Sequence, residues 1–231
     1  MKREKAPAKA RAFFHSYTYR LYTHKKVAIN MRSICTAIAA SLVVATSGSA
    51  IAATSDGDFA VYGWGARDCN AITTILGGDQ AAQAKVQIAE WISGYISSAN
   101  RNTDSVYDLT PVKTYIPMVS LAQNICINNS NQLLESVVYS MIAGFSELRL
   151  PTDSPVVSLS HKGRSVTVNE ATVLQVQQFL ISEGQLDGSA DGQFGAKTAE
   201  ALEKWQENAD LTPNGLPDMV TLFLISKKIK Q

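Results

Sequence analysis

The chain has 231 residues, 45% of them hydrophobic, which is enough to bury one medium core or two small ones and excludes a fibrous or wholly disordered protein. Its formal net charge of +1 conceals an uneven distribution, because nine of the 21 Lys and Arg residues, but only Glu4 among the acids, precede residue 53. Beyond that point 12 basic residues stand against 19 acidic ones, and basic residues cluster only in the tail 227–230. Phosphate binding needs clustered Lys and Arg, so nucleic acid is not an expected partner.

The segment 31–53 has the layout of a secretory signal peptide. Arg32 precedes an apolar core rich in Ala, Leu and Val, and Ala50 and Ala52 supply the small residues that a signal peptidase reads. We expect cleavage after Ala52 or Ala53 and a mature protein in the periplasm or cell envelope. An uncleaved membrane anchor stays open, because the apolar stretch is nearly long enough to span a bilayer.

The preceding residues 1–30 are too many for an ordinary signal n-region. They indicate either a mis-assigned start, with Met31 as the true first residue, or an extended n-region. A targeting peptide for an organelle fits less well, because it would favour Arg over Lys and contain more Ser.

Residues 54–150 predict a helical domain without a period-two strand pattern. One long helix is expected after Asp79, and it ends at the polar cluster 97–104. Another follows the polar cluster 128–131, where apolar residues recur at spacings of three and four: Leu134, Val137, Val138, Met141, Phe145 and Leu148. Such a stripe must pack against another element. Between these helices, Pro111 and Pro117 bracket a connection into a third helix.

Cys69 and Cys126 are the cysteines that remain once the signal segment, with Cys35, is removed. An even pair in an exported protein predicts one disulfide, which would join a first short helix to the end of the third. Closing a loop of this size would stabilise the fold by about 4 kcal/mol in the chain-entropy model. Two free buried thiols are the alternative.

The segment 151–168 separates the helical region from the C-terminal one. Its prolines and serines, and the turn-like sequence 161–164, indicate an interdomain linker. A short hairpin is the competing interpretation, because the residues on both sides of that turn have strand composition. These residues are Val156, Val157, Leu159, Val166 and Val168. A lone hairpin is marginal in water, so it would need a neighbouring domain to lie on.

Residues 169–231 predict three short helices around one apolar stripe. Asn169 can cap the first helix, and Gly184 suits the left-handed position that ends it. The tight loop 186–195 follows, with glycines that permit positive φ and aspartates, Asp187 among them, that can bond nearby backbone amides. The expected fold is therefore all-α: a signal peptide, a disulfide-stapled helical domain, a linker and a three-helix module.

A series of motifs marks this C-terminal module. In chain order they are Val176-Gln177-Gln178-Phe179-Leu180, Gly184, Asp191-Gly192-Gln193-Phe194-Gly195, Lys197-Thr198, Ala201-Leu202, Trp205-Gln206, Gly215, Asp218 and Thr221-Leu222. In order and spacing they resemble the peptidoglycan-binding domains that are appended to many bacterial cell-wall hydrolases and envelope proteins. The resemblance covers about a quarter of the chain and implies that the module binds peptidoglycan, through its stem peptide or its glycan.

The ligand site is expected where the glycine-rich loop meets the second helix of the module. A helix N-terminus offers unpaired amides and a partial positive charge, which suit the carboxylates of a stem peptide. The candidate site residues are Asp191, Gly192, Gln193, Phe194, Gly195 and Thr198. The competing interpretation is that they only build the turn, with Phe194 and Trp205 as core anchors.

The same loop also resembles the start of a calcium-binding loop, through Asp187, Ser189, Asp191 and Gly192. The position that needs a bidentate Glu holds Thr198 instead, so no metal site is expected, and no other cofactor.

One predicted helix of the N-terminal region carries Ala89, Trp91, Gly94 and Tyr95 and lies between the two cysteines. This pattern resembles, more faintly, the small disulfide-stapled helical domains of the periplasmic acid-stress chaperone and toxin-immunity type. No binding residue carries over from that resemblance. We expect this domain to contact a protein partner in the envelope.

Catalytic groups are scarce beyond the signal segment. His161 is the only histidine there, whereas zinc amidases and endopeptidases need several His and acidic ligands and a catalytic Cys needs a His. We therefore expect a non-catalytic envelope protein that binds peptidoglycan. One alternative is a muramidase that uses Glu90, beside Trp91, as its acid. The other is a periplasmic chaperone or inhibitor whose C-terminal module does not bind the wall.

Overall fold

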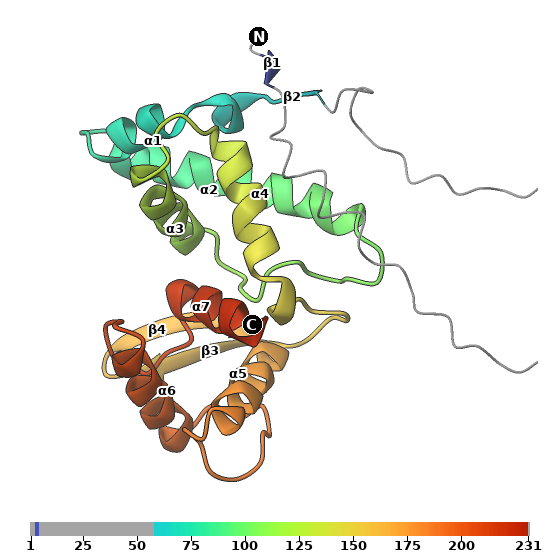
Figure 1. The fold of residues 1–231 in the computed structure, drawn as a ribbon, viewed down its shortest axis with the longest axis vertical. Helices are drawn as coiled ribbons and strands as arrows, with labels where there is room; N and C mark the ends of the chain where they lie inside the picture. Colours follow the sequence, from blue (N-terminus) through green and yellow to red (C-terminus); the bar gives the residue numbers. More distant parts are fainter. Residues whose placement is uncertain (1–2, 5–57, 231) are drawn as a thin grey trace, which may run out of the picture. The chain divides into compact units, whose positions relative to one another are not determined.

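The computed structural model describes residues 3–4 and 58–230, so the predicted signal peptide 31–53 and the start at Met31 lie outside the described residues. The chain divides into two units, Met1–Val61, of which only residues 3–4 and 58–61 are described, and Tyr62–Gln231. In the first unit, β1 (Arg3–Glu4) pairs antiparallel with β2 (Phe59–Ala60). The second unit contains every described helix and one β-hairpin (Figure 1).

Helices alone build the first part of the larger unit. They are η2 (Gly63–Ala66), α1 (Cys69–Leu76), α2 (Ala81–Arg101), α3 (Ile116–Ile127), α4 (Leu134–Gly144) and η3 (Ser146–Leu148), where η denotes a 3-10 helix. The α1 helix begins where the Asp68 carboxylate accepts a hydrogen bond of 2.8 Å from the Ala71 amide. The apolar stripe of α4 is buried as its spacing predicts, with Val137, Val138 and Met141 fully enclosed.

The predicted disulfide between Cys69 and Cys126 is confirmed. It joins the start of α1 to the end of α3, and both residues are almost completely shielded from solvent. The bond encloses α2 within the loop that it closes. It therefore cross-links the helical part at its core and not at its surface.

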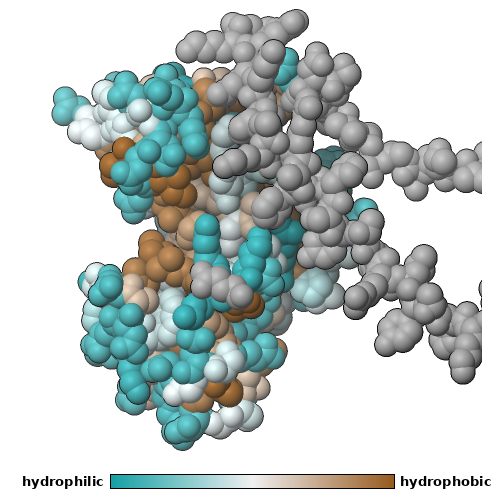
Figure 2. Space-filling model, in the orientation of Figure 1, coloured by the Kyte–Doolittle hydropathy of each residue, from teal (hydrophilic) through white to brown (hydrophobic). Residues whose placement is uncertain are grey.

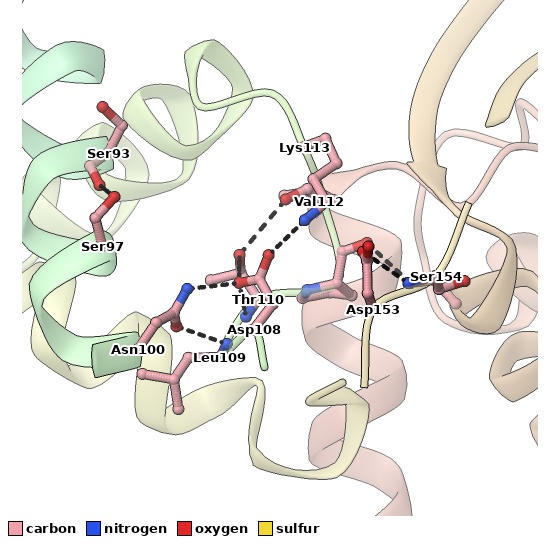
Figure 3. A network of polar contacts seen from close by, with 12 residues as sticks. Ser93, Ser97, Asn100, Asp108, Leu109, Thr110, Val112, Lys113, Asp153 and Ser154 are labelled. Atoms are coloured by element: carbon pink, nitrogen blue, oxygen red, sulfur yellow. Dashed lines mark hydrogen bonds and ion pairs between the residues drawn. The ribbon is translucent and has the colours of Figure 1, made fainter. Parts of the chain in front are cut away.

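The connection between α2 and α3 is held by the buried carboxylate of Asp108 (Figure 3). Its Oδ1 accepts hydrogen bonds of 3.0 Å from both the amide and the hydroxyl of Thr110, and its Oδ2 pairs with Lys113 Nζ at 2.9 Å. Asn100 of α2 accepts a hydrogen bond from the Leu109 amide. A buried charge is tolerated only when it is paired in this way, so this network has a structural role.

The segment between η3 and the C-terminal helices forms an antiparallel hairpin, β3 (Val156–His161) and β4 (Arg164–Asn169). Lys162 and Gly163 make its two-residue turn, both with positive φ. Leu159 and Val168 of the hairpin are buried. Val168 also forms an isolated antiparallel bridge with Val112, which supplies the neighbouring support that a lone hairpin lacks. The fold is therefore mostly helical, and the strict all-α expectation is corrected by this small sheet.

Three helices complete the unit: α5 (Glu170–Ser182), α6 (Ala196–Asn208) and α7 (Met219–Ile229). Leu180, Leu202 and Leu222, one from each helix, are fully buried. The rings of Phe179 and Trp205 pack edge to face, with centroids 5.4 Å apart. The three-helix arrangement expected for residues 169–231 is thus present.

Asn169 stands at the N-cap position of α5, as expected, but does not cap the helix with its side chain. Both of its side-chain polar atoms are buried without a hydrogen-bond partner. The Ala171 amide donates instead to Ser154 Oγ at 3.0 Å, and the Glu170 amide donates to the Pro155 carbonyl. The residues that precede the hairpin therefore close the end of this helix.

The α7 helix packs against α3, α4 and η3. Phe223 lies against Gly144 and meets the Phe145 ring edge to face at 5.4 Å. The Glu147 amide donates to Ser226 Oγ, and Thr172 Oγ1 donates to the Pro111 carbonyl. Buried apolar residues form one continuous cluster through both parts of the unit.

The hydropathy of the visible surface varies along the larger unit. Figure 2 shows hydrophobic residues gathered where α3 and α7 approach each other, and mainly hydrophilic residues over the end that carries α6. In the part of the chain that the structure describes, no helix combines the length and the hydrophobicity required to cross a membrane.

Candidate ligand-binding site

The loop between α5 and α6 borders a pocket with a volume of about 450 Å³. Five of the six predicted site residues line it: Asp191, Gln193, Phe194, Gly195 and Thr198. The sixth, Gly192, is buried beneath the loop surface. The pocket is further lined by Asp187, Ser189 and Lys197 and by the apolar Leu186 and Ala196, so polar and apolar groups contribute about equally to its wall.

The loop takes its shape from one buried side chain, Gln177 of α5, which is 3% exposed. Gln177 Oε1 accepts hydrogen bonds from the amides of Asp191 at 3.0 Å and Gly192 at 2.8 Å. Gln177 Nε2 lies within hydrogen-bond distance of Asp191 Oδ1, the Gln193 carbonyl and Thr198 Oγ1. A single amide group therefore connects α5, the loop and the first turn of α6.

The Asp191 carboxylate is exposed and belongs to the same network. Its Oδ1 accepts a hydrogen bond of 2.9 Å from the Gln193 amide, and this bond, with the one from Gln177, holds the pKa of Asp191 below its usual value. Hydrogen bonds donated to a carboxylate favour its charged form. Asp191 thus builds the loop and contributes negative charge to the pocket.

The first turn of α6 forms one wall of the pocket. Gly195 is its N-cap residue, and no side chain caps the helix there. The backbone amides of the first helical turn have no partner within the helix, so they present partial positive charge. Gly195 is extended, and a β-carbon added to it would meet no atom within 4 Å.

A second loop, between α6 and α7, repeats this construction around Gln206, which is fully buried. Gln206 Oε1 accepts from the amides of Asn214 at 2.8 Å and Gly215 at 2.9 Å. Its Nε2 lies within hydrogen-bond distance of Asn214 Oδ1, the Leu216 carbonyl and Thr221 Oγ1. Residue by residue, Asn214, Gly215 and Thr221 take the places of Asp191, Gly192 and Thr198.

The two loops differ at the helix that follows each of them. In the second loop, the residue equivalent to Gly195 is Asp218, and its Oδ1 accepts a hydrogen bond of 2.9 Å from the Thr221 amide. A carboxylate of the protein therefore caps α7, whereas the equivalent position before α6 has no side chain. Of these two similar loops, only the first borders the 450 Å³ pocket.

The second loop is also covered by the turn of the β3–β4 hairpin. His161 lies close to Gly215, and His161 Nε2 and Lys162 Nζ both contact Glu203 Oε1 of α6. The Lys162 ammonium is the main cause of a lowered pKa at Glu203. His161 thus contributes to packing and to an ion-pair cluster.

The catalytic candidate Glu90 lies outside this pocket. Glu90 is exposed on α2, so it lacks the apolar enclosure that the acid of a muramidase needs. The described residues contain no group of three or more His, Cys, Asp or Glu side chains placed to hold a metal ion.

The sequence identified the loop and placed Gln177 and Gln206 within the family motifs, but it did not predict that these two side chains hold the loops in place. A signal for them was present in the sequence. Asp191-Gly192 and Asn214-Gly215 are each followed by a threonine at the same distance along the chain, and each pair is preceded by a helix that carries a glutamine. A turn that repeats in this way indicates that a side chain from the preceding helix binds its backbone.

Residues 169–224 match the family model described as "Putative peptidoglycan binding domain". The match spans α5, α6 and most of α7, and therefore both glutamine-centred loops and the pocket. It confirms the resemblance of the C-terminal part to peptidoglycan-binding domains. Comparison with curated proteins found no match, and neither did comparison with solved structures.

Proposed function

We propose that this protein is a non-catalytic component of the bacterial cell envelope that binds peptidoglycan through the pocket at the start of α6. The observation that carries the proposal is the position of this pocket, within the residues that match the peptidoglycan-binding family. A pocket of a few hundred cubic ångströms with a few convergent polar groups is the usual form of a small-ligand site. The signal-peptide pattern of residues 31–53 supports an envelope location.

The first turn of α6 is the part of the pocket that suits a stem-peptide carboxylate. Unpaired amides and the helix dipole favour an anion at this end of a helix. The second loop supports the same assignment, because there the Asp218 carboxylate binds the first turn of α7. Where Gly195 stands in place of that aspartate, a carboxylate of the ligand takes the equivalent position.

Three neighbouring side chains complete the proposed site. Thr198 is 4% exposed and bonded to Gln177, so it fixes the floor of the pocket. Gln193 is exposed and donates to Glu170 Oε1 at 3.1 Å, which places its amide at the rim. Phe194 is half-buried and gives the pocket an apolar side.

The helical part, with its disulfide, is proposed to contact a protein partner in the envelope. The packing of α7 against α3 and α4 supports a fixed orientation between this part and the peptidoglycan pocket. A partner bound to the helical part would therefore be held at a defined position on the wall.

The experiment is co-sedimentation of the purified protein with insoluble sacculi, comparing Gly195→Asp with Gly195→Ala. Both variants add a β-carbon where there is space for one. Only the aspartate introduces a carboxylate, which copies the cap that Asp218 gives to α7. We expect Gly195→Asp to be at least as stable as the wild type, since an N-cap aspartate is better than glycine by a few tenths of a kcal/mol and better than alanine by about 1 kcal/mol. It should bind sacculi about tenfold more weakly, because its own carboxylate competes with that of the ligand.

Gly195→Ala should pellet like the wild type. If the unmodified protein does not pellet with sacculi, the proposed function is wrong. If Gly195→Asp pellets as well as Gly195→Ala, peptidoglycan binds elsewhere. A turbidity assay on the same sacculi tests the non-catalytic part, since a fall in turbidity would reveal a hydrolase.

A further inference from the structure

One carboxylate in the pocket, that of Asp187, takes no part in the hydrogen bonds that shape the loop. Asp187 is exposed and lines the pocket. Asp191 accepts two hydrogen bonds that shape the loop, whereas within the described residues the Asp187 side chain forms neither a hydrogen bond nor an ion pair. The turn role that the sequence suggested for Asp187 is therefore filled by Asp191. The Asp187 carboxylate remains available to a ligand.

The opposite charge is present in the same pocket. The uncapped first turn of α6 carries partial positive charge, and the exposed Lys197 lies in that turn. Among the described residues Lys197 forms no ion pair. The pocket thus has a negative part at Asp187 and Asp191 and a positive part at the start of α6.

We propose that the pocket selects a zwitterionic amino acid end, in which one carbon bears both an ammonium and a carboxylate. The inference rests on the proposed function and deepens it. The carboxylate binds at the start of α6, and the ammonium pairs with Asp187. Asp187 is then the residue that determines specificity for the amine.

Chemistry identifies which part of peptidoglycan presents such a group. The side-chain end of a diaminopimelate residue carries an ammonium and a carboxylate on one carbon. A lysine side chain has no carboxylate, and the C-terminal end of a stem peptide has no ammonium. A cross-link at that amine turns it into a neutral amide. The protein would therefore prefer stem peptides that have not been cross-linked.

Three synthetic stem peptides test the inference in calorimetric titrations of the purified protein. The first ends in diaminopimelate, the second has its side-chain amine acetylated, and the third has its side-chain carboxylate amidated. We expect the wild type to bind the first peptide about fivefold more tightly than the second, the upper end for an exposed ion pair. It should also bind the first more tightly than the third.

Asp187→Asn should remove the preference for the first peptide over the second and keep the preference over the third. Asp210→Asn is the matched control, because Asp210 is exposed beyond the end of α6 and outside the pocket lining. It should behave like the wild type. Retained binding of the acetylated peptide shows that Asp187→Asn is folded.

These experiments distinguish an error in the proposed function from an error in the inference about Asp187. If no peptide binds to the wild type and sacculi do not pellet it, the proposed function is wrong. If the wild type binds the free and acetylated peptides equally, or if Asp187→Asn keeps the fivefold preference, the inference is wrong while peptidoglycan binding stands. If Asp187→Asn weakens all three peptides equally, Asp187 does not read the amine, and the inference is again wrong.

Discussion

Replacing Gln177 by leucine is the most direct perturbation of the pocket loop. Leucine has a similar size and can occupy the same buried position, but it neither accepts nor donates hydrogen bonds. The change removes the acceptor of the Asp191 and Gly192 amides and the donor to the Gln193 carbonyl. Whatever stability is lost then reports on the hydrogen bonds and not on a cavity.

The expected magnitude follows from the burial of each group. Gly192 is buried, so its unpaired amide costs about 1–3 kcal/mol, whereas Asp191 and Gln193 are exposed and their groups can bind water instead. Each of those two lost bonds costs about 0.5–1.5 kcal/mol. The total is about 4 kcal/mol, which corresponds to a lowering of the melting temperature by about 8–16 °C for a unit of this size.

Gln206→Leu is the matched control in the thermal unfolding assay, because Gln206 makes the same set of bonds in the second loop. Both variants should lose similar stability. Well below their melting temperatures, only Gln177→Leu should also lose sacculus binding. A melting temperature of Gln177→Leu within about 2 °C of the wild type would refute the assigned role of Gln177. Equal loss of binding in both variants would show that the loop itself does not form the site.

Three further predictions test other parts of the structure. Reducing the Cys69–Cys126 disulfide should lower a single melting transition by roughly 10 °C, because a loop of 57 residues is released in a unit with one continuous core; two transitions, one of them unmoved, would contradict this. Phe223→Ala should destabilise the protein by about 2 kcal/mol in denaturant unfolding, whereas Val220→Ala on the exposed side of α7 should cost less than about 0.5 kcal/mol. The pKa of Asp191 is lowered in the folded state, so the Asp191 carboxylate stabilises the fold above its ordinary pKa, and this stabilisation is lost as the pH falls through the pKa of the folded state. Nuclear magnetic resonance of the Gln193 amide should follow the titration of Asp191, and an ordinary pKa for Asp191 would contradict the prediction.

Local patterns were enough to predict most of the helical elements. The spacing of Leu134, Val137 and Met141 predicted α4, and the glycine-rich sequence before α6 predicted the loop. These features depend on side chains a few positions apart, so they can be read from the sequence. The pair Cys69 and Cys126 was also predictable, because no other cysteine remained to pair with either. The predicted signal peptide lies outside the described residues and stays a prediction.

Other features were decided by contacts between residues far apart in the chain. Asn169 is of a residue type that often caps helices, but the side chain that accepts a hydrogen bond from the first turn of α5 is that of Ser154. Only the fold of the preceding segment brings Ser154 to this helix. The segment 151–168 had both linker and strand character in the sequence, and the Val112–Val168 bridge supports the strand. The role of Asp187 also depends on contacts between residues far apart in the chain. The periodicity of the sequence shows which side chains are buried. Only the packed structure shows that Gln177 and Asp191 shape the loop and that Asp187 faces the pocket.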